Sequence, residues 1–135
     1  MLDTHVWLDI VAGRKPMAPR ALRKVDAAAA DRLLYIAAIT PWEIAMLSAA
    51  GKVKVAGPTL EWLNQSLRAT QTSVAPLDPA IAVDAVELPS WAHRDPADRL
   101  IVATARFLGA LLLTRDSEIL DYAETVKAVR VMEPS

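Results

Sequence analysis

Short apolar runs alternate with amphipathic stretches along the chain, and this alternation limits the possible fold more than any other feature of the sequence. Apolar runs of strand length predict buried strands, whereas the stretches between them have helical periodicity. Strands that alternate with helices are typical of an α/β domain with a mostly parallel sheet. The candidate strands are residues 33–39, 73–75, 110–114 and 129–132.

Helix boundary signals separate these runs. Proline is favoured in the first turn of a helix and glycine just after its last turn. Gly51, Gly57 and Gly109 stand where helices are expected to end. We expect helices over residues 6–12, 19–30, 41–50, 59–69, 79–86 and 96–108, and a short helical turn at 117–122. No linker divides the chain, and 135 residues suit a single domain.

Composition excludes several classes of site. The chain has no cysteine, which excludes disulfides, thiolate zinc sites, iron–sulfur clusters and a cysteine nucleophile. Its four scattered glycines form neither a phosphate-binding loop nor a dinucleotide-binding motif. No basic segment precedes an apolar stretch at the N-terminus, and no apolar run has membrane-spanning length. We therefore expect a cytoplasmic protein without a membrane segment.

Carboxylates follow several candidate strands or begin the next helix. Ligands bind beyond the carboxyl ends of parallel strands, so these side chains are expected to converge. Like charges so close together cannot all stay ionised, and Mg²⁺ or Mn²⁺, which prefers oxygen ligands, would neutralise them. Such a site suits phosphodiester hydrolysis, in which metals activate water and neutralise the leaving oxygen. The four candidates are Asp3, Glu43, Asp98 and Asp116.

Helix capping is the alternative explanation for two of these acids. Thr40 and Glu43 have the spacing of a capping box with Pro41 at the first helical position, and Asp95 and Asp98 have the same spacing. If Glu43 and Asp98 only cap helices, alanine should destabilise the protein by about 0.5–2 kcal/mol. If they are clustered ligands, their removal should leave metal-free stability unchanged or raised.

Four blocks of the sequence resemble the PIN-domain ribonucleases, and most closely the VapC-type toxins of toxin–antitoxin pairs. They occur in the family's order and span nearly the whole chain, and the third is the most specific. The blocks are residues 2–8 (LDTHVWL), 41–45 (PWEIA), 93–105 (HRDPADRLIVATA) and 113–116 (LTRD).

The resemblance implies a single PIN domain over residues 1–135 with a three-layer α/β/α sandwich. It also implies an RNA substrate, Mg²⁺ or Mn²⁺, a homodimer and a VapB-like antitoxin partner. By motif position, Asp3, Glu43, Asp98 and Asp116 match the acidic quartet that is both catalytic and metal-binding in the family. Thr4 matches a residue whose hydroxyl orients the first acid. Asp95 matches an acid of this branch for which capping is a sufficient role.

The segment before Asp3 departs from the family pattern. Only Met1 and Leu2 precede Asp3, whereas family members usually have a longer apolar strand there. We expect either a very short first strand or a start that lies upstream. In both cases Asp3 is expected to be weakly anchored.

The net charge of −1 conceals two opposite halves. Residues 1–68 carry nine basic and six acidic residues, and residues 69–135 carry six and ten. The basic residues from Arg14 to Lys24 form either a solvated face or a rim that contacts phosphates. The candidate RNA contacts are Arg14, Lys15, Arg94 and Arg115.

Other polar residues beside the candidate ligands have structural explanations. Arg99 is expected to be an ion-pair partner, and His5 and His93 are expected to pack or orient locally because neither has a triad-like companion.

The leading hypothesis is a metal-dependent endoribonuclease toxin that leaves 5′-phosphate and 3′-hydroxyl ends. The alternative is a PIN-like scaffold that binds RNA or a protein without cutting. An aspartyl-phosphate phosphatase is a third possibility, but it needs a second aspartate where His5 stands.

Overall fold

The computed structural model describes all 135 residues. Its sheet is parallel: β1 (Tyr35–Ala37) pairs with β2 (Ser73–Ala75), and β3 (Leu112–Leu113) pairs with β4 (Val131–Met132). Leu2 bridges Ile36 of β1 and Leu113 of β3, both in parallel. The order across the sheet is therefore β2, β1, the N-terminal segment, β3 and β4.

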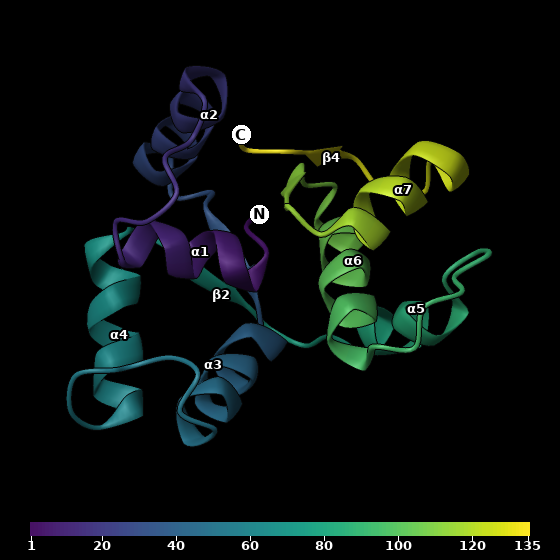
Figure 1. Cartoon of the computed structure of the whole chain (residues 1–135). Coiled ribbons are helices and arrows are strands. Elements are labelled where there is room, and N and C mark those ends of the chain that lie inside the picture. The colour runs from purple at the N-terminus through teal and green to yellow at the C-terminus, as the bar shows by residue number, and fades with distance from the viewer.

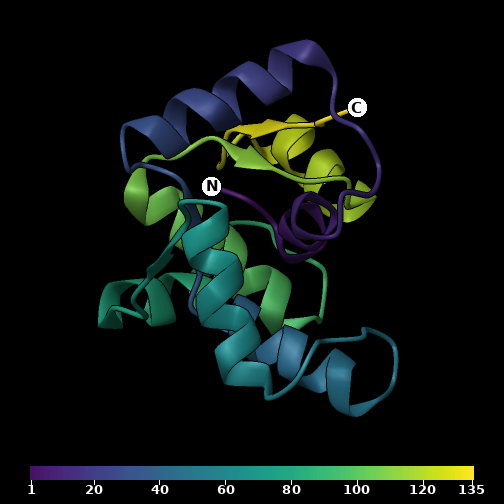
Figure 2. The same cartoon turned by 90° about the vertical axis from the view of Figure 1, so that its left-hand side faces the viewer.

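Helices cover both faces of this sheet. In Figure 1, α1, α2 and α4 lie on one side of the N-terminal segment, and α5, α6 and α7 lie on the other. Figure 2, seen from the side of α2 and α4, shows the N-terminus near the middle of the molecule. None of the helices combines the length and apolar character needed to cross a membrane. The helices are α1 (Thr4–Val11), α2 (Pro19–Ala30), α3 (Ile39–Ala49), α4 (Thr59–Ala69), α5 (Pro79–Glu87), α6 (Pro96–Leu108) and α7 (Ser117–Val126).

Two separate cores lie on the two faces of the sheet. Successive residues of a strand point to opposite faces, so neighbouring strand residues enter different cores. This arrangement confirms the predicted three-layer α/β/α sandwich. The strand residues are Leu2, Ile36 and Leu113 in the core with α1 and α2, and Met1, Ala37 and Leu112 in the core with α6 and α7.

The elements differ from the sequence predictions mainly at their ends. The strand predicted over 33–39 is limited to β1, because α3 already begins at Ile39. The short turn predicted at 117–122 is a full helix, α7, whose Ile119, Tyr122 and Ala123 are buried. Burial of this apolar face stabilises a helix that propensity alone did not predict.

The expectation that Asp3 is weakly anchored is wrong. Leu2 is fully buried, and its N–H donates to the Tyr35 carbonyl at 2.8 Å. The Asp3 N–H donates to the Leu113 carbonyl at 3.0 Å on the other side. Hydrogen bonds to both neighbouring strands therefore hold Asp3 at the centre of the sheet, although very few residues precede it.

Candidate metal centre

The four candidate acids line one cleft. They come from four separate places: the N-terminus of α1, the first half of α3, the first turn of α6 and the N-cap of α7. The cleft has a volume of about 240 Å³ and is also lined by Thr4, His5, Leu8, Leu47 and Asp95. Convergence at the carboxyl ends of the strands was expected from the sequence, and the structure brings the four together there. They are Asp3, Glu43, Asp98 and Asp116.

Asp3 is the most buried of the four acids. Its Oδ1 accepts from the Thr4 N–H at 2.7 Å, and its Oδ2 accepts from the Thr114 hydroxyl at 2.6 Å. Burial raises the pKa of Asp3, against the opposing effects of His5 and of these hydrogen bonds. The carboxylate is thus fixed in orientation and poorly solvated, as a preorganised cation ligand should be.

Glu43 is oriented by Thr4 and does not act as a helix cap. The Thr4 hydroxyl donates to Glu43 Oε1 at 2.6 Å and lies 2.9 Å from the Thr40 hydroxyl. Thr40 is buried inside α3, whose N-cap is Ala38, so the predicted capping box is wrong. The predicted role of Thr4 also changes, because its hydroxyl orients Glu43 whereas only its main chain contacts Asp3. Burial raises the pKa of Glu43, and Asp3 and Asp95 raise it further.

Asp98 faces other carboxylates. The cap of α6 comes from Asp95, whose side chain accepts from the Ala97 N–H at 2.9 Å, as the sequence predicted. Burial, followed by the charges of Asp95, Asp116, Asp3 and Glu43, raises the pKa of Asp98 to about 7. No hydrogen bond or cation is among the causes that act on this pKa. Capping therefore explains Asp95 but not Asp98.

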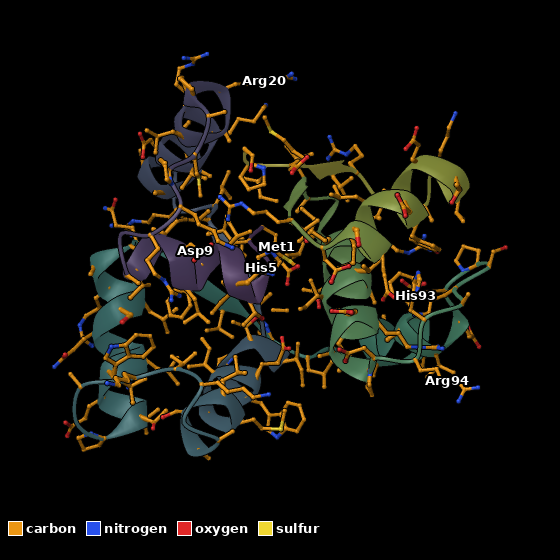
Figure 3. The ribbon with its side chains drawn as sticks, in the orientation of Figure 1. Met1, His5, Asp9, Arg20, His93 and Arg94 are labelled. Carbon is orange, nitrogen blue, oxygen red and sulfur yellow. The ribbon has the colours of Figure 1, made fainter.

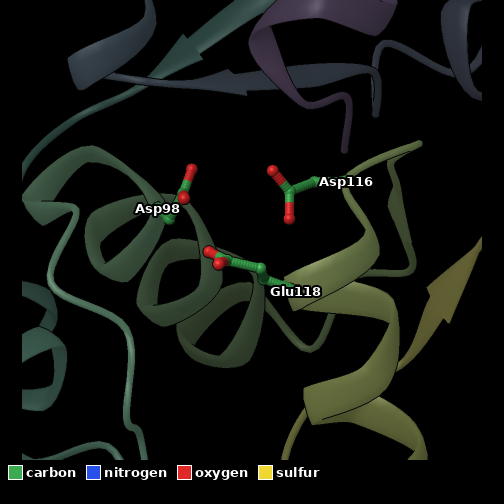
Figure 4. A group of neighbouring side chains, drawn as sticks. All are labelled: Asp98, Asp116 and Glu118. Carbon is green, nitrogen blue, oxygen red and sulfur yellow. The ribbon is translucent and has the colours of Figure 1, made fainter.

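Asp116 and Glu118 complete the acidic face. Asp116 Oδ1 accepts from the Ile119 N–H at 3.0 Å and caps α7. Carboxylate oxygens of Asp98, Asp116 and Glu118 all lie within 4.8 Å of one another, and Figure 4 shows the three side chains pointing together from α6 and α7. Sequence reasoning missed Glu118, because an acid in the first turn of a helix is common without a ligand.

The donor set fits a hard divalent cation. Every candidate ligand offers a carboxylate oxygen, and Mg²⁺ and Mn²⁺ prefer such ligands. Burial and neighbouring carboxylates raise the pKa values of Asp3, Glu43 and Asp98, so the cleft disfavours their negative charge in the absence of a cation. A bound divalent cation would supply the missing positive charge.

The basic residues near the cleft have different surroundings. Arg115, a candidate RNA contact, is largely buried, and its Nη1 lies 3.0 Å from Asp9 Oδ2. Arg14 is exposed, with its Nε 3.6 Å from Asp9 Oδ1. Arg94 lies on the outside of the molecule beyond α6, far from His5 in Figure 3. The structure thus leaves Arg14 and its neighbour Lys15 exposed to solvent.

The other polar residues singled out from the sequence serve local structure. Arg99 donates to the His93 and Ala85 carbonyls at 3.3 and 3.5 Å, so the expected ion pair is replaced by main-chain contacts. His93 Nδ1 lies 3.3 Å from Glu118 Oε2. His5 Nε2 accepts from the Arg115 N–H at 3.0 Å.

Comparisons with known proteins agree with this architecture. The family model described as "PIN domain" matches residues 1–125. Ribonuclease VapC22 of Mycobacterium tuberculosis is 37% identical over 122 residues, which cover 88% of each chain. A chain in the crystal structure of VapBC2 from Rickettsia felis, bound to a DNA fragment from their promoter, has the same fold with a TM-score of 0.67. It is 15% identical, and the match covers 98% of this chain and 96% of that one. The chain therefore belongs to the PIN domain family and, within it, to the VapC-type proteins.

Proposed function

We propose that the chain is an endoribonuclease that hydrolyses RNA phosphodiester bonds with a bound divalent cation, Mg²⁺ or Mn²⁺. The observation that carries this proposal is the convergence of Asp3, Glu43, Asp98 and Asp116 in one cleft, where burial raises the pKa values of Asp3, Glu43 and Asp98. Membership of the PIN family and the similarity to a protein named as a ribonuclease support RNA as the substrate.

Each acid has a distinct part in the proposed site. Asp3 and Asp116, whose hydrogen bonds fix their orientation, would hold the cation together with Asp98. Glu43, oriented by the Thr4 hydroxyl, would complete the set from α3. The chemistry that a bound divalent cation supplies here is activation of water and neutralisation of the leaving oxygen. Attack of water on phosphorus with the 3′ oxygen as the leaving group breaks the P–O3′ bond and gives 5′-phosphate and 3′-hydroxyl ends.

RNA must be held against a face that repels it. Arg14 and Lys15 are exposed; Arg14 Nε lies 3.6 Å from Asp9 Oδ1, and the Lys15 carbonyl accepts from Arg115 Nη2 at 3.4 Å. We assign them the role of phosphate contacts, because exposed cations supply most of the sequence-independent affinity for nucleic acid. We do not assign this role to Arg94, because it lies far from His5 on the outside of the molecule. We do not assign it to Arg115 either, because its side chain is paired with Asp9.

The partners follow from the family. The VapC-type relationship supports a toxin that acts in the cytoplasm, forms a homodimer and binds a VapB-like antitoxin. The structural neighbour belongs to a complex named VapBC2, which supports the same kind of partner.

A non-cleaving scaffold has lost its main support. A poorly anchored first acid would favour such a scaffold, whereas hydrogen bonds to both neighbouring strands hold the segment that carries Asp3. If calorimetry detected no binding of Mg²⁺ or Mn²⁺, a non-cleaving scaffold would be favoured over a nuclease.

A cleavage assay tests the proposal. RNA is incubated with the protein and Mg²⁺ or Mn²⁺, then with EDTA, and in parallel with Asp98→Asn. The matched control is Asp78→Asn, which changes a partly exposed aspartate that caps α5 outside the cleft. We expect cleavage by the parent and the control, and none with EDTA or with Asp98→Asn. Cleavage that survives both EDTA and Asp98→Asn would refute the proposal.

A further inference from the structure

Arg115 lies in the sequence between Thr114, which contacts Asp3, and Asp116. Two residues of α1 contact Arg115, one at its main chain and one at its side chain. On one side of Arg115, the Thr114 hydroxyl donates to Asp3 Oδ2 at 2.6 Å. On the other side, the Asp116 N–H donates to the same Thr114 hydroxyl at 3.0 Å. Any displacement of Arg115 therefore changes how Asp3 and Asp116 are placed relative to each other.

The first hold is on the main chain of Arg115. Its N–H donates to His5 Nε2 at 3.0 Å. A ring nitrogen that accepts a hydrogen bond carries no proton, so the proton of neutral His5 lies on Nδ1. That Nδ1 faces Asp3 Oδ2 at 3.5 Å. His5 thus links the main chain next to Asp116 with the carboxylate of Asp3.

The second hold is on the side chain of Arg115. Its Nη1 lies 3.0 Å from Oδ2 of Asp9, and both side chains are largely buried, at 14% and 8% exposed. The other two nitrogens of the guanidinium also donate: Nε to the Ser135 hydroxyl at 3.3 Å and Nη2 to the Lys15 carbonyl at 3.4 Å. A buried ion pair of this kind is more effective in fixing geometry than in adding stability.

The two holding residues are spaced for this task. His5 and Asp9 are four residues apart on α1, so their side chains lie one above the other on the same face of the helix. Figure 3 labels both along α1, with His5 at the end near Met1. Asp3 is the N-cap of this same helix. A single rigid element therefore carries one acid of the site and holds the segment that carries another.

We propose that His5 and Asp9 are positioning residues of the nuclease, which hold Arg115 and thereby fix the separation of the Asp3 and Asp116 carboxylates for a divalent cation. This inference rests on the proposed function. It assigns neither residue a contact with substrate. It differs from a purely structural ion pair because breaking the hold should weaken cation binding more than it weakens folding.

The experiment measures Mn²⁺ affinity by titration calorimetry, kcat and KM on RNA, and thermal unfolding in EDTA. The variants are Asp9→Asn, His5→Ala and His5→Gln. Gln is informative because its amide oxygen can accept from the Arg115 N–H as Nε2 does. The matched control is Asp84→Asn, which breaks another Arg–Asp pair, with Nε of Arg106 2.8 Å from Asp84 Oδ2, between α5 and α6.

We expect Asp9→Asn and His5→Ala to weaken Mn²⁺ binding by about 10–100-fold, the usual effect of removing a residue that orients a metal ligand. Their kcat should fall at limiting Mn²⁺ and recover at saturating Mn²⁺, with KM for RNA unchanged. His5→Gln should retain most of the affinity, and Asp84→Asn should bind Mn²⁺ as the parent does. If Asp9→Asn does not fold, the comparison of His5→Ala with His5→Gln decides, because His5 is 42% exposed and tolerates substitution.

Several results would overturn the inference. One is equal Mn²⁺ affinity in the parent, Asp9→Asn and His5→Ala. Another is an equal loss of Mn²⁺ affinity in Asp84→Asn, which would indicate a general effect of stability.

¹⁵N NMR of the metal-free protein gives a readout independent of activity. We expect His5 as the Nδ1–H tautomer, and the Nε2–H tautomer would contradict the inference. A parent protein that binds no Mn²⁺ would instead refute the proposed function and, with it, this inference.

Discussion

Replacing Asp98 by asparagine should stabilise the metal-free protein at neutral and alkaline pH. Burial and four neighbouring carboxylates raise the pKa of Asp98 from 3.8 to about 7. Ionised Asp98 is therefore disfavoured in the folded state, whereas in the unfolded state it ionises freely. Asparagine has nearly the same shape and carries no charge, so it removes this penalty.

The magnitude follows from the pKa. At about 1.36 kcal/mol per pKa unit, the rise in the pKa of Asp98 corresponds to an upper limit of about 4 kcal/mol. The side chain is only half-buried, and solvent screening reduces the effect to about 1–2 kcal/mol. Well below the unfolded pKa of 3.8 both states are protonated and the penalty is absent. It grows as pH rises between the two pKa values and is constant above about pH 7.

Urea unfolding in EDTA at pH 4 and pH 8 measures this difference. At pH 8 we expect the free energy of unfolding of Asp98→Asn to exceed that of the parent by about 1–2 kcal/mol, which corresponds to a rise of about 4–8 °C in Tm. At pH 4, close to the unfolded pKa of 3.8, most of this difference should be lost. Asp121→Asn, an exposed aspartate on α7, serves as the control. A loss of stability in Asp98→Asn at pH 8 would refute the reasoning and favour helix capping.

Three further predictions concern the same framework. Saturating Mn²⁺, at about 100 times its Kd, should stabilise the parent by about 2.7 kcal/mol in thermal unfolding and Asp98→Asn by much less; equal shifts would place the cation elsewhere. Thr4→Val removes the hydroxyl that donates to Glu43, so it should cost about 1–3 kcal/mol and weaken Mn²⁺ binding measured by calorimetry; unchanged affinity would exclude the assigned role of Thr4. Trp7→Ala removes a fully buried ring that packs edge-on against Trp62, so it should cost about 3–5 kcal/mol in urea unfolding; a loss below 1 kcal/mol would contradict its central place in the core.

Local signals in the sequence were sufficient for most of the helices. Proline at the first helical position predicted the starts of α2, α5 and α6 correctly, and Gly109 follows α6 in the left-handed conformation. These signals act within one turn of helix, so the sequence displays them directly. The beginning of α3 was placed two residues late because Thr40, read as a cap, is used in a tertiary contact with Thr4.

Features that depend on distant segments were not predictable in this way. The anchoring of Asp3 comes from Tyr35 and Leu113, and no pattern in the residues around Asp3 indicates it. The pairing of Asp9 with Arg115 joins residues 106 apart in the sequence. The convergence of the four acids was predicted, because the position of each relative to its strand follows from the topology of a parallel sheet. The additional position of Glu118 near Asp98 depends on how α6 and α7 pack.

Analysis of the cleavage products tests the central claim most directly. Labelled RNA is incubated with the protein in EDTA and then with excess Mn²⁺, and the ends of the products are identified. We predict no cleavage in EDTA, and with Mn²⁺ products that carry 5′-phosphate and 3′-hydroxyl ends, as expected for attack by water on phosphorus. Cleavage in EDTA would show that the cation is not needed, and products with 2′,3′-cyclic phosphate ends would show that the ribose 2′-hydroxyl attacks in place of water. Either result would contradict the account.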